Sequence, residues 1–275
     1  MSSTSSVINS WADLASLIGA CADGVWIFRG ESDTGYALKP KAGRVGNYRG
    51  AARKPDYDPT HERNALELLK RQARPYLAHT PSTDLEWLAI AQHHGMSTRL
   101  LDWTESMLVA AYFATAPAGL NGDAVIYGIQ GLRKLSAEEE AEPLEAKSAG
   151  VYLPPHITPR IPAQRSVFTL HPDPTAAFDP PELTRWVIKT KSCNLIKHVL
   201  NACAINESSL FPERRRERRP AAQPRAARDQ QEVWKEEERD AQARRRTRRP
   251  VVTRGALASP HQEPERYVGF AVLDQ

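Results

Sequence analysis

The stretch LAIAQHHGMSTRLLDWTESMLVAAYFAT, residues Leu88–Thr115, contains a dense polar segment between two patterns of helical spacing. The first pattern runs from Thr83 to His94 and opens on a capping box, in which Thr83 accepts from the amide of Glu86. Gly95 is a natural end for this helix. The sequence therefore predicts a helix that delivers its C-terminal end to the polar segment.

The second pattern opens on Asp102, followed three residues later by Glu105, and continues at helical spacing to Thr115. The polar segment between the two patterns contains Ser97, Thr98 and Arg99. Because backbone amides at a helix start favour anions, we expect this segment to be a loop that faces a ligand. The alternative for each residue alone is structural, with Asp102 as a helix cap and Arg99 in an ion pair.

With 275 residues, of which 41% are hydrophobic and 25% charged, the chain can bury one sizeable core. It contains neither a run of apolar residues long enough to span a membrane nor a secretion signal, so we expect a cytoplasmic protein without membrane contact. Its three cysteines are scattered, which indicates no disulfide framework and no metal site.

The net charge of +4 is unevenly distributed. Residues 213–250 hold 14 Lys and Arg against 8 Asp and Glu, a local +6, so the other residues sum to −2. We expect residues 213–275 to form a mostly disordered Arg/Pro-rich tail, from a shifted reading frame or an unrelated extension. Such a tail predicts at most weak, salt-dependent nucleic-acid binding, and the rest of the chain is not a nucleic-acid binder on charge alone.

Apolar runs alternate irregularly with helical patterns along the chain. Strands are expected at residues 25–28, 123–130, 167–170 and 185–190, and further helices at 10–21, 60–77 and from 192. Because no regular strand–helix–strand rhythm appears, we predict an α+β fold, a single compact mixed domain over residues 1–212 with a small sheet flanked by helices. The strand Val25–Phe28 is expected at its centre.

Arg29 and Gly30 follow this strand directly. Glycine lets a backbone approach a ligand closely or turn with positive φ, so we expect both residues at the mouth of a pocket. A structural ion pair is the alternative for Arg29. The basic loop that contains Lys39 either closes over an anionic group or is a solvated turn. Arg160 and Gln164 flank a turn that we expect to be buried.

The segments WIFRGES (26–32), YALKPKAGR (36–44), QHHGMSTRLLDWTES (92–106) and AINESSLFP (204–212) together resemble the FRG domain, a family named for its (F/Y)RG motif. The resemblance covers about residues 24–212. This sequence departs from the family pattern at Ser97, where Pro is usual, and at Arg165 and Ser166, which replace Gln-Gly. The family is largely uncharacterised, so the resemblance implies a domain and leaves the activity open.

The placement of these motifs is similar to the layout of ADP-ribosyltransferases. In those enzymes an Arg-Gly motif holds NAD, a Ser-Thr motif supports the site, and a Glu stabilises the cation formed as nicotinamide leaves. By this resemblance the three roles fall to Arg29 with Gly30, to Ser97 with Thr98, and to Gln164. A neutral Gln164 supplies no negative charge, so Glu105 or Asp102 would have to replace it. NAD is the cofactor or substrate that the resemblance implies.

The alternative function keeps the pocket without the chemistry. In this interpretation four cationic residues gather around a phosphate-bearing nucleotide or an anionic partner: Arg29, Lys39, Arg99 and Arg160. A third interpretation is structural, because buried polar networks also rigidify cores.

Overall fold

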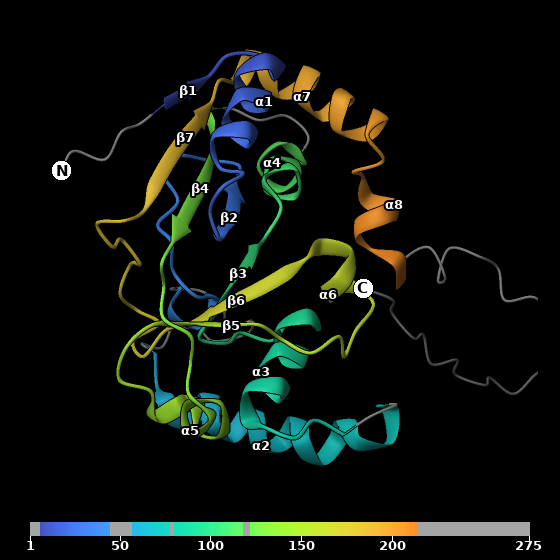
Figure 1. The fold of residues 1–275 in the computed structure, drawn as a ribbon. Helices are drawn as coiled ribbons and strands as arrows, with labels where there is room; N and C mark the ends of the chain where they lie inside the picture. Colours follow the sequence, from blue (N-terminus) through green and yellow to red (C-terminus); the bar gives the residue numbers. More distant parts are fainter. Residues whose placement is uncertain (1–5, 45–56, 78–79, 118–121, 214–275) are drawn as a thin grey trace, which may run out of the picture. The chain divides into compact units, whose positions relative to one another are not determined.

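The computed structural model describes residues 6–44, 57–77, 80–117 and 122–213 (Figure 1). These residues form an α+β fold, as predicted, with helices packed on one mixed sheet. The expected disordered tail and its nucleic-acid binding lie outside the described residues, except for Glu213. Within the described ranges no helix has the length and apolar character needed to cross a membrane.

The described residues form a seven-stranded sheet in the order β1-β7-β4-β2-β3-β6-β5 (Figure 1). Neighbouring strands pair antiparallel, except β1 and β7, which are parallel. The strand predicted at Val25–Phe28 lies in β2, the middle strand, which confirms its central position. The strands are β1 (Ser6–Ile8), β2 (Trp26–Glu31), β3 (Leu100–Thr104), β4 (Ala124–Gln130), β5 (Gly150–Tyr152), β6 (Ser166–Leu170) and β7 (Thr184–Ile188).

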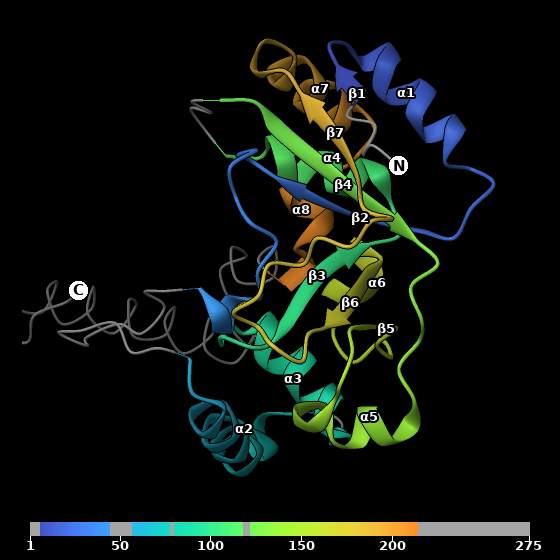
Figure 2. The same cartoon turned by 90° about the vertical axis from the view of Figure 1, so that its left-hand side faces the viewer.

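The longer helices lie in two groups at opposite ends of the sheet (Figures 1 and 2). The helices are α1 (Trp11–Ala20), α2 (Pro59–Ala73), α3 (Asp84–His93), α4 (Met107–Thr115), α5 (Ala137–Ala141), α6 (Arg160–Gln164), α7 (Thr190–Ala202) and α8 (Glu207–Leu210). Short 3-10 turns are η1 (Lys41–Gly43), η2 (Arg74–Tyr76) and η3 (Pro143–Glu145). Helix α2 packs beside α3.

Each half of the sheet has its own apolar core. Helices α1, α4 and α7 cover the half that contains β2 and β4, through a core with Phe28 and Ile126. Helices α2 and α3 pack beside the half that contains β3 and β6, through a core with Leu88 and Phe168. A third core, with Ile27, Leu101 and Val167, crosses the junction of β2 with β3 and joins the two halves.

Gly30 allows α4 to lie directly against β2. A Cβ atom at this position would be 1.9 Å from the carbonyl oxygen of Ala110. No L-residue other than glycine fits such an approach, so the glycine is required for helix–strand packing. The missing Cβ of Gly30 therefore serves helix packing, while the residue also lines the cavity described below.

The predicted helix start at Asp102 is wrong. Residues Leu100–Thr104 form β3, which pairs with β6 from Leu100↔Leu170 to Thr104↔Ser166. The actual N-cap of α4 is Ser106, whose hydroxyl accepts from the amide of Val109. A capping box is a local pattern, whereas this strand is decided by a partner more than sixty residues away. Asp102 therefore projects from a strand instead of capping a helix.

Arg99 lies in the interior, between α2 and the start of β3. Its side chain and that of Glu62 are each 2% exposed, and Arg99 NH2 lies 3.0 Å from Glu62 Oε2. The backbone amide of Arg99 also donates to Glu62, and NH2 donates to the hydroxyl of Tyr57. The predicted ligand contact of Arg99 is replaced by this buried network, which fixes α2 to the sheet.

Replacing Glu62 with Ala should lower the free energy of unfolding by about 3 to 5 kcal/mol, because the Arg99 guanidinium would stay buried without its carboxylate. Urea unfolding followed by fluorescence measures this change. The control is Glu145→Ala, which breaks the exposed pair of Glu145 with Arg63 and should cost no more than about 1 kcal/mol. Equal effects of the two substitutions would contradict the assigned role of Arg99.

Candidate functional site

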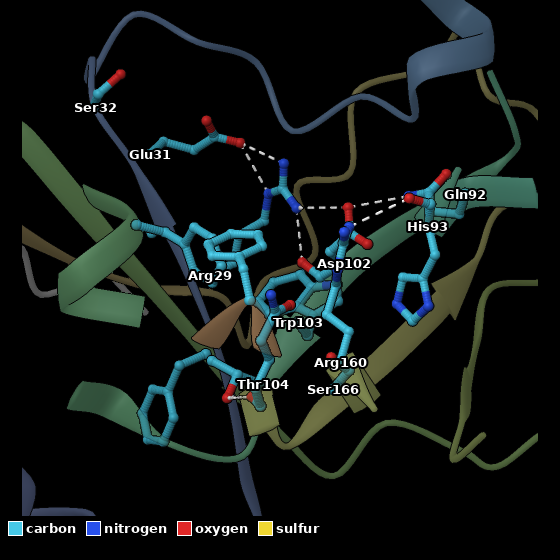
Figure 3. Close-up of a pocket in the computed structure, with 15 residues that line it drawn as sticks. Arg29, Glu31, Ser32, Gln92, His93, Asp102, Trp103, Thr104, Arg160 and Ser166 are labelled. Atoms are coloured by element: carbon cyan, nitrogen blue, oxygen red, sulfur yellow. Dashed lines mark hydrogen bonds and ion pairs between the residues drawn. The ribbon is translucent and has the colours of Figure 1, made fainter. Parts of the chain in front are cut away.

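Strands β2 and β3 pair at a single position, Phe28 with Thr104. Past this position the two strands are unpaired, and residues of both line a cavity of about 370 Å³, here called the main cavity (Figure 3). β2 contributes Phe28 to Glu31, and β3 contributes Asp102 to Thr104. The other lining residues are Ser32, Gln92, His93, Phe113, Arg160, Gln164, Ser166 and Phe211.

Arg29 bridges the two strands at this opening. Its Nε and NH2 both donate to Glu31 Oε1, at 2.8 and 2.6 Å, and its NH1 donates to the carbonyl oxygen of Asp102 at 2.7 Å (Figure 3). The side chains of Arg29 and Glu31 are only 13% and 14% exposed. These contacts with described residues use three of the five guanidinium N–H groups, which leaves two for a ligand.

Asp102 is oriented by a chain of hydrogen bonds from α3. Gln92 Nε2 donates to Asp102 Oδ2 at 3.0 Å, and Gln92 Oε1 accepts from the hydroxyl of Thr98. Thr98 is fully buried, so it fixes the amide of Gln92 without reaching the main cavity. The Asp102 side chain stays 56% exposed, with Oδ2 3.9 Å from Arg29 NH1. Asp102 is therefore a held carboxylate that remains open to a ligand.

Arg160, at the start of α6, forms the opposite wall. Its Nε and NH2 donate to Glu213 Oε1, its NH1 donates to the carbonyl oxygen of His93 at 3.2 Å, and its guanidinium lies 5.2 Å from the ring centre of Phe211. Gln164 Nε2 donates to the carbonyl oxygen of Leu210. The segment around α8 is thereby attached to the cavity wall.

His93 is a neutral group in this wall. Burial, opposed by Asp102 and assisted by Arg160, lowers the pKa of His93 to about 4. Its Nδ1 lies 3.0 Å from the hydroxyl of Thr158. Burial, assisted by Arg29, also lowers the pKa of His171 to about 4, beside Thr169. At neutral pH the charges of the main cavity therefore come from two arginines and two carboxylates.

The structure brings five of the predicted site residues together in the main cavity: Arg29, Gly30, Asp102, Arg160 and Gln164. Ser97, Thr98, Lys39, Arg99 and Glu105 do not line it. Lys39 lies near Asp173, whose pKa it helps to lower after the hydrogen bonds from Thr175 and Ala176. Glu105 faces outward and pairs with Arg165 at 3.5 Å. Ser97 and Thr98, which were expected to support the site, therefore do not reach the main cavity. The polar residues next in the chain that line it are Asp102 and Thr104 of β3.

Several lining residues were not selected from the sequence, although a signal existed for two of them. Glu31 is two residues from Arg29, and strand periodicity places both on one face. Gln92 follows a run of apolar residues in α3, which are buried. A polar side chain at that point is expected to have a hydrogen-bond partner. Phe113 and Phe211 gave no such signal, because an aromatic residue in a helix or loop is typical of a core.

The described residues contain no group of three or more His, Cys, Asp or Glu side chains positioned to hold a metal ion. The polar groups of the main cavity instead suit an organic ligand with hydroxyl and anionic parts, because they combine guanidinium donors with carboxylate acceptors.

The family model of the FRG domain matches residues 24–120. This range contains β2, α3, β3 and α4, and therefore Arg29, Gln92 and Asp102. Arg160, Gln164 and Phe211 lie beyond it. No curated protein and no solved structure matches the chain.

Stability should fall as the pH is lowered from about 6.5 to about 4, because the unfolded chain binds protons at His93 and His171 that the folded protein does not. Each histidine contributes a slope of up to about 1.4 kcal/mol per pH unit. His93→Gln should remove one such contribution in urea unfolding at pH 7 and pH 5. His198→Gln, on an exposed position of α7, is the control. An unchanged slope in His93→Gln contradicts its buried neutral state.

Arg29→Lys should lower the free energy of unfolding by about 1 to 3 kcal/mol, because an ammonium cannot donate to both Glu31 and the Asp102 carbonyl with the geometry of the guanidinium fork. Arg63→Lys is a matched control, since Arg63 pairs with the exposed Glu145. That control should change stability by about 0.5 kcal/mol or less. If Arg29→Lys is as stable as the control, Arg29 does not hold the strands together.

Proposed function

The chain carries an FRG domain at residues 24–120, and we propose that the main cavity, to which this domain contributes Arg29 and Asp102, binds an NAD-like nucleotide. The observation that carries the proposal is the opening between β2 and β3, where a guanidinium and an open carboxylate face one cavity. Its volume of about 370 Å³ falls within the range typical of small-molecule sites.

The lining chemistry supports a nucleotide over a simple anion. Arg29 and Arg160 are balanced by Glu31 and Asp102, so the cavity has no excess positive charge for an anion alone. Carboxylates accept hydrogen bonds from ribose hydroxyls, and the amides of Gln92 and Gln164 donate and accept.

Aromatic walls complete the proposed nucleotide site. Phe113 and Phe211 contact each other edge to face, with ring centres 6.1 Å apart, and both line the main cavity. Flat apolar faces of this kind suit a base or a nicotinamide ring. A nicotinamide ring joined to ribose carries a positive charge, which the carboxylates of Glu31 and Asp102 would favour.

A second candidate function, transfer of ADP-ribose, is favoured by the exposure of Asp102. Two carboxylates were expected for this chemistry. Asp102 lines the main cavity, and Glu105 does not. In this reaction the bond from the ribose to nicotinamide breaks, its electron pair leaves with nicotinamide, and the carboxylate stabilises the positive ribose. Water or an acceptor then forms the new bond and releases a proton.

Calorimetric titration of the full chain with NAD and with ADP-ribose tests the binding proposal. We expect both to bind. Arg160→Gln should weaken both, because it removes a cationic wall of the cavity, whereas Arg63→Gln on α2 should not. If neither nucleotide binds the parent protein, the proposal is wrong.

Release of nicotinamide from NAD, with and without a cell extract as a source of acceptors, tests the enzymatic candidate. Asp102→Asn should keep NAD binding within a few-fold and reduce release by about a hundredfold or more, as expected for a lost electrostatic contribution to the transition state. Glu105→Gln is the control and should release nicotinamide at the parent rate. NAD binding without release in the parent leaves a non-catalytic binding module.

A further inference from the structure

A second, smaller cavity adjoins the main cavity. Its volume is about 150 Å³, and it shares Arg29, Gln92 and Asp102 with the main cavity. The remaining walls are Lys41, Arg44, Met96, Leu100 and Leu101. We call it the basic pocket, because it gathers three cationic side chains from two separate segments.

The turn that carries Lys41 and Arg44 has a fixed position. The amide of Ala42, inside η1, donates to the carbonyl oxygen of Thr98 at 3.1 Å. A Cβ atom on Gly43 would lie 1.7 Å from the carbonyl oxygen of Pro174, so the turn sits directly against that segment. The two cations therefore stand on a backbone that is packed on both sides.

The two side chains are held at the pocket by backbone carbonyls. Lys41 Nζ donates to the carbonyl oxygen of Gly95 at 2.5 Å, just beyond the end of α3. Arg44 Nε donates to the carbonyl oxygen of Lys39 at 2.9 Å. Both of these acceptors are neutral backbone carbonyls.

The two cavities differ in their balance of charge. In the basic pocket, Arg29 is already paired with Glu31, so Lys41 and Arg44 against Asp102 leave a formal charge of +1. The main cavity has two arginines and two carboxylates and is formally neutral. A ligand with a neutral or cationic end and an anionic end would place the anionic end in the basic pocket.

We infer that the basic pocket binds the phosphoryl groups of a nucleotide whose nucleoside part occupies the main cavity, with Lys41 and Arg44 as phosphate ligands. This inference rests on the nucleotide-binding function proposed above. Guanidinium and ammonium groups are the side chains that proteins use for phosphate. The shared wall formed by Arg29 and Asp102 marks the point where the ligand passes from one cavity to the other.

The competing explanation is that Lys41 only neutralises the carbonyl end of α3. It predicts a change in stability without a change in phosphate affinity. Arg44 distinguishes the two explanations, because it is exposed and donates to Lys39 in its own turn instead of to the end of α3. A loss of phosphate affinity in an Arg44 variant cannot come from the carbonyl end of α3.

The experiment is calorimetric titration of the full chain with ADP-ribose and, separately, with inorganic pyrophosphate. Lys41→Gln and Arg44→Gln should each weaken the binding of both probes at least about tenfold, as expected for the loss of a charged hydrogen bond to phosphate. The matched control is Lys39→Gln, which removes the same charge from the same loop but does not line the basic pocket. It should bind both probes within about twofold of the parent. Thermal unfolding of each variant reports any loss of folding.

The outcomes separate this inference from the proposed function. If the parent binds ADP-ribose and Arg44→Gln binds it equally well, the basic pocket is not the phosphate site, while nucleotide binding stands. Equal losses in Lys39→Gln and Arg44→Gln also overturn the inference, because they indicate a general effect of charge. If the parent binds pyrophosphate through Lys41 and Arg44 but no nucleotide, the pocket is an anion site and the proposed function fails. Binding of neither probe by the parent overturns both.

Discussion

The structure depends on how β2 and β3 meet. Adjacent antiparallel strands normally continue their backbone hydrogen bonds along the shared length, yet these two pair only at Phe28 and Thr104. One residue further, the side chain of Arg29 takes the carbonyl oxygen of Asp102, which a continued ladder would give to a backbone amide. A guanidinium reaches farther than an amide, so it satisfies the carbonyl while leaving the strands apart. The main cavity is a consequence of this substitution.

Apolar packing on both sides of the junction and across it makes the opening possible. The half of the sheet with β2 is held by α1, α4 and α7, and the half with β3 packs beside α2 and α3. A third core, with Ile27, Leu101 and Val167, joins the halves across the junction, so side-chain packing holds the strands there without a full set of backbone bonds. The buried Arg99–Glu62 pair fixes α2 to the start of β3, and the glycine at position 30 fixes α4 to β2. These two attachments set the positions of the strands that carry Asp102 and Arg29.

The polar groups of the site are oriented before any ligand arrives. Thr98 fixes Gln92, Gln92 fixes Asp102, and Glu31 with the Asp102 carbonyl fixes Arg29. Such preorganisation lowers the cost of ordering side chains on binding, and it places charge where a ligand can use it. Arg160 is held in the same way by Glu213 and by the carbonyl oxygen of His93, so the wall beyond the FRG match is also ordered.

The sequence by itself determined the fold class, the helix capped by Thr83, the central strand at Val25–Phe28, and the place of Arg29 and Gly30 in the lining of one cavity. These features follow from local periodicity, capping and glycine positions, which a single segment contains. The tertiary structure alone decided that Leu100–Thr104 is a strand, because its pairing partner β6 is distant in the chain. It also decided where each arginine lies: Glu62 on α2 holds Arg99 in the interior, whereas Arg29 joins β2 to β3 and lines the main cavity. Local sequence decides which conformation a segment prefers. Which charged side chains and strand ends form a site depends on segments that come together only on folding.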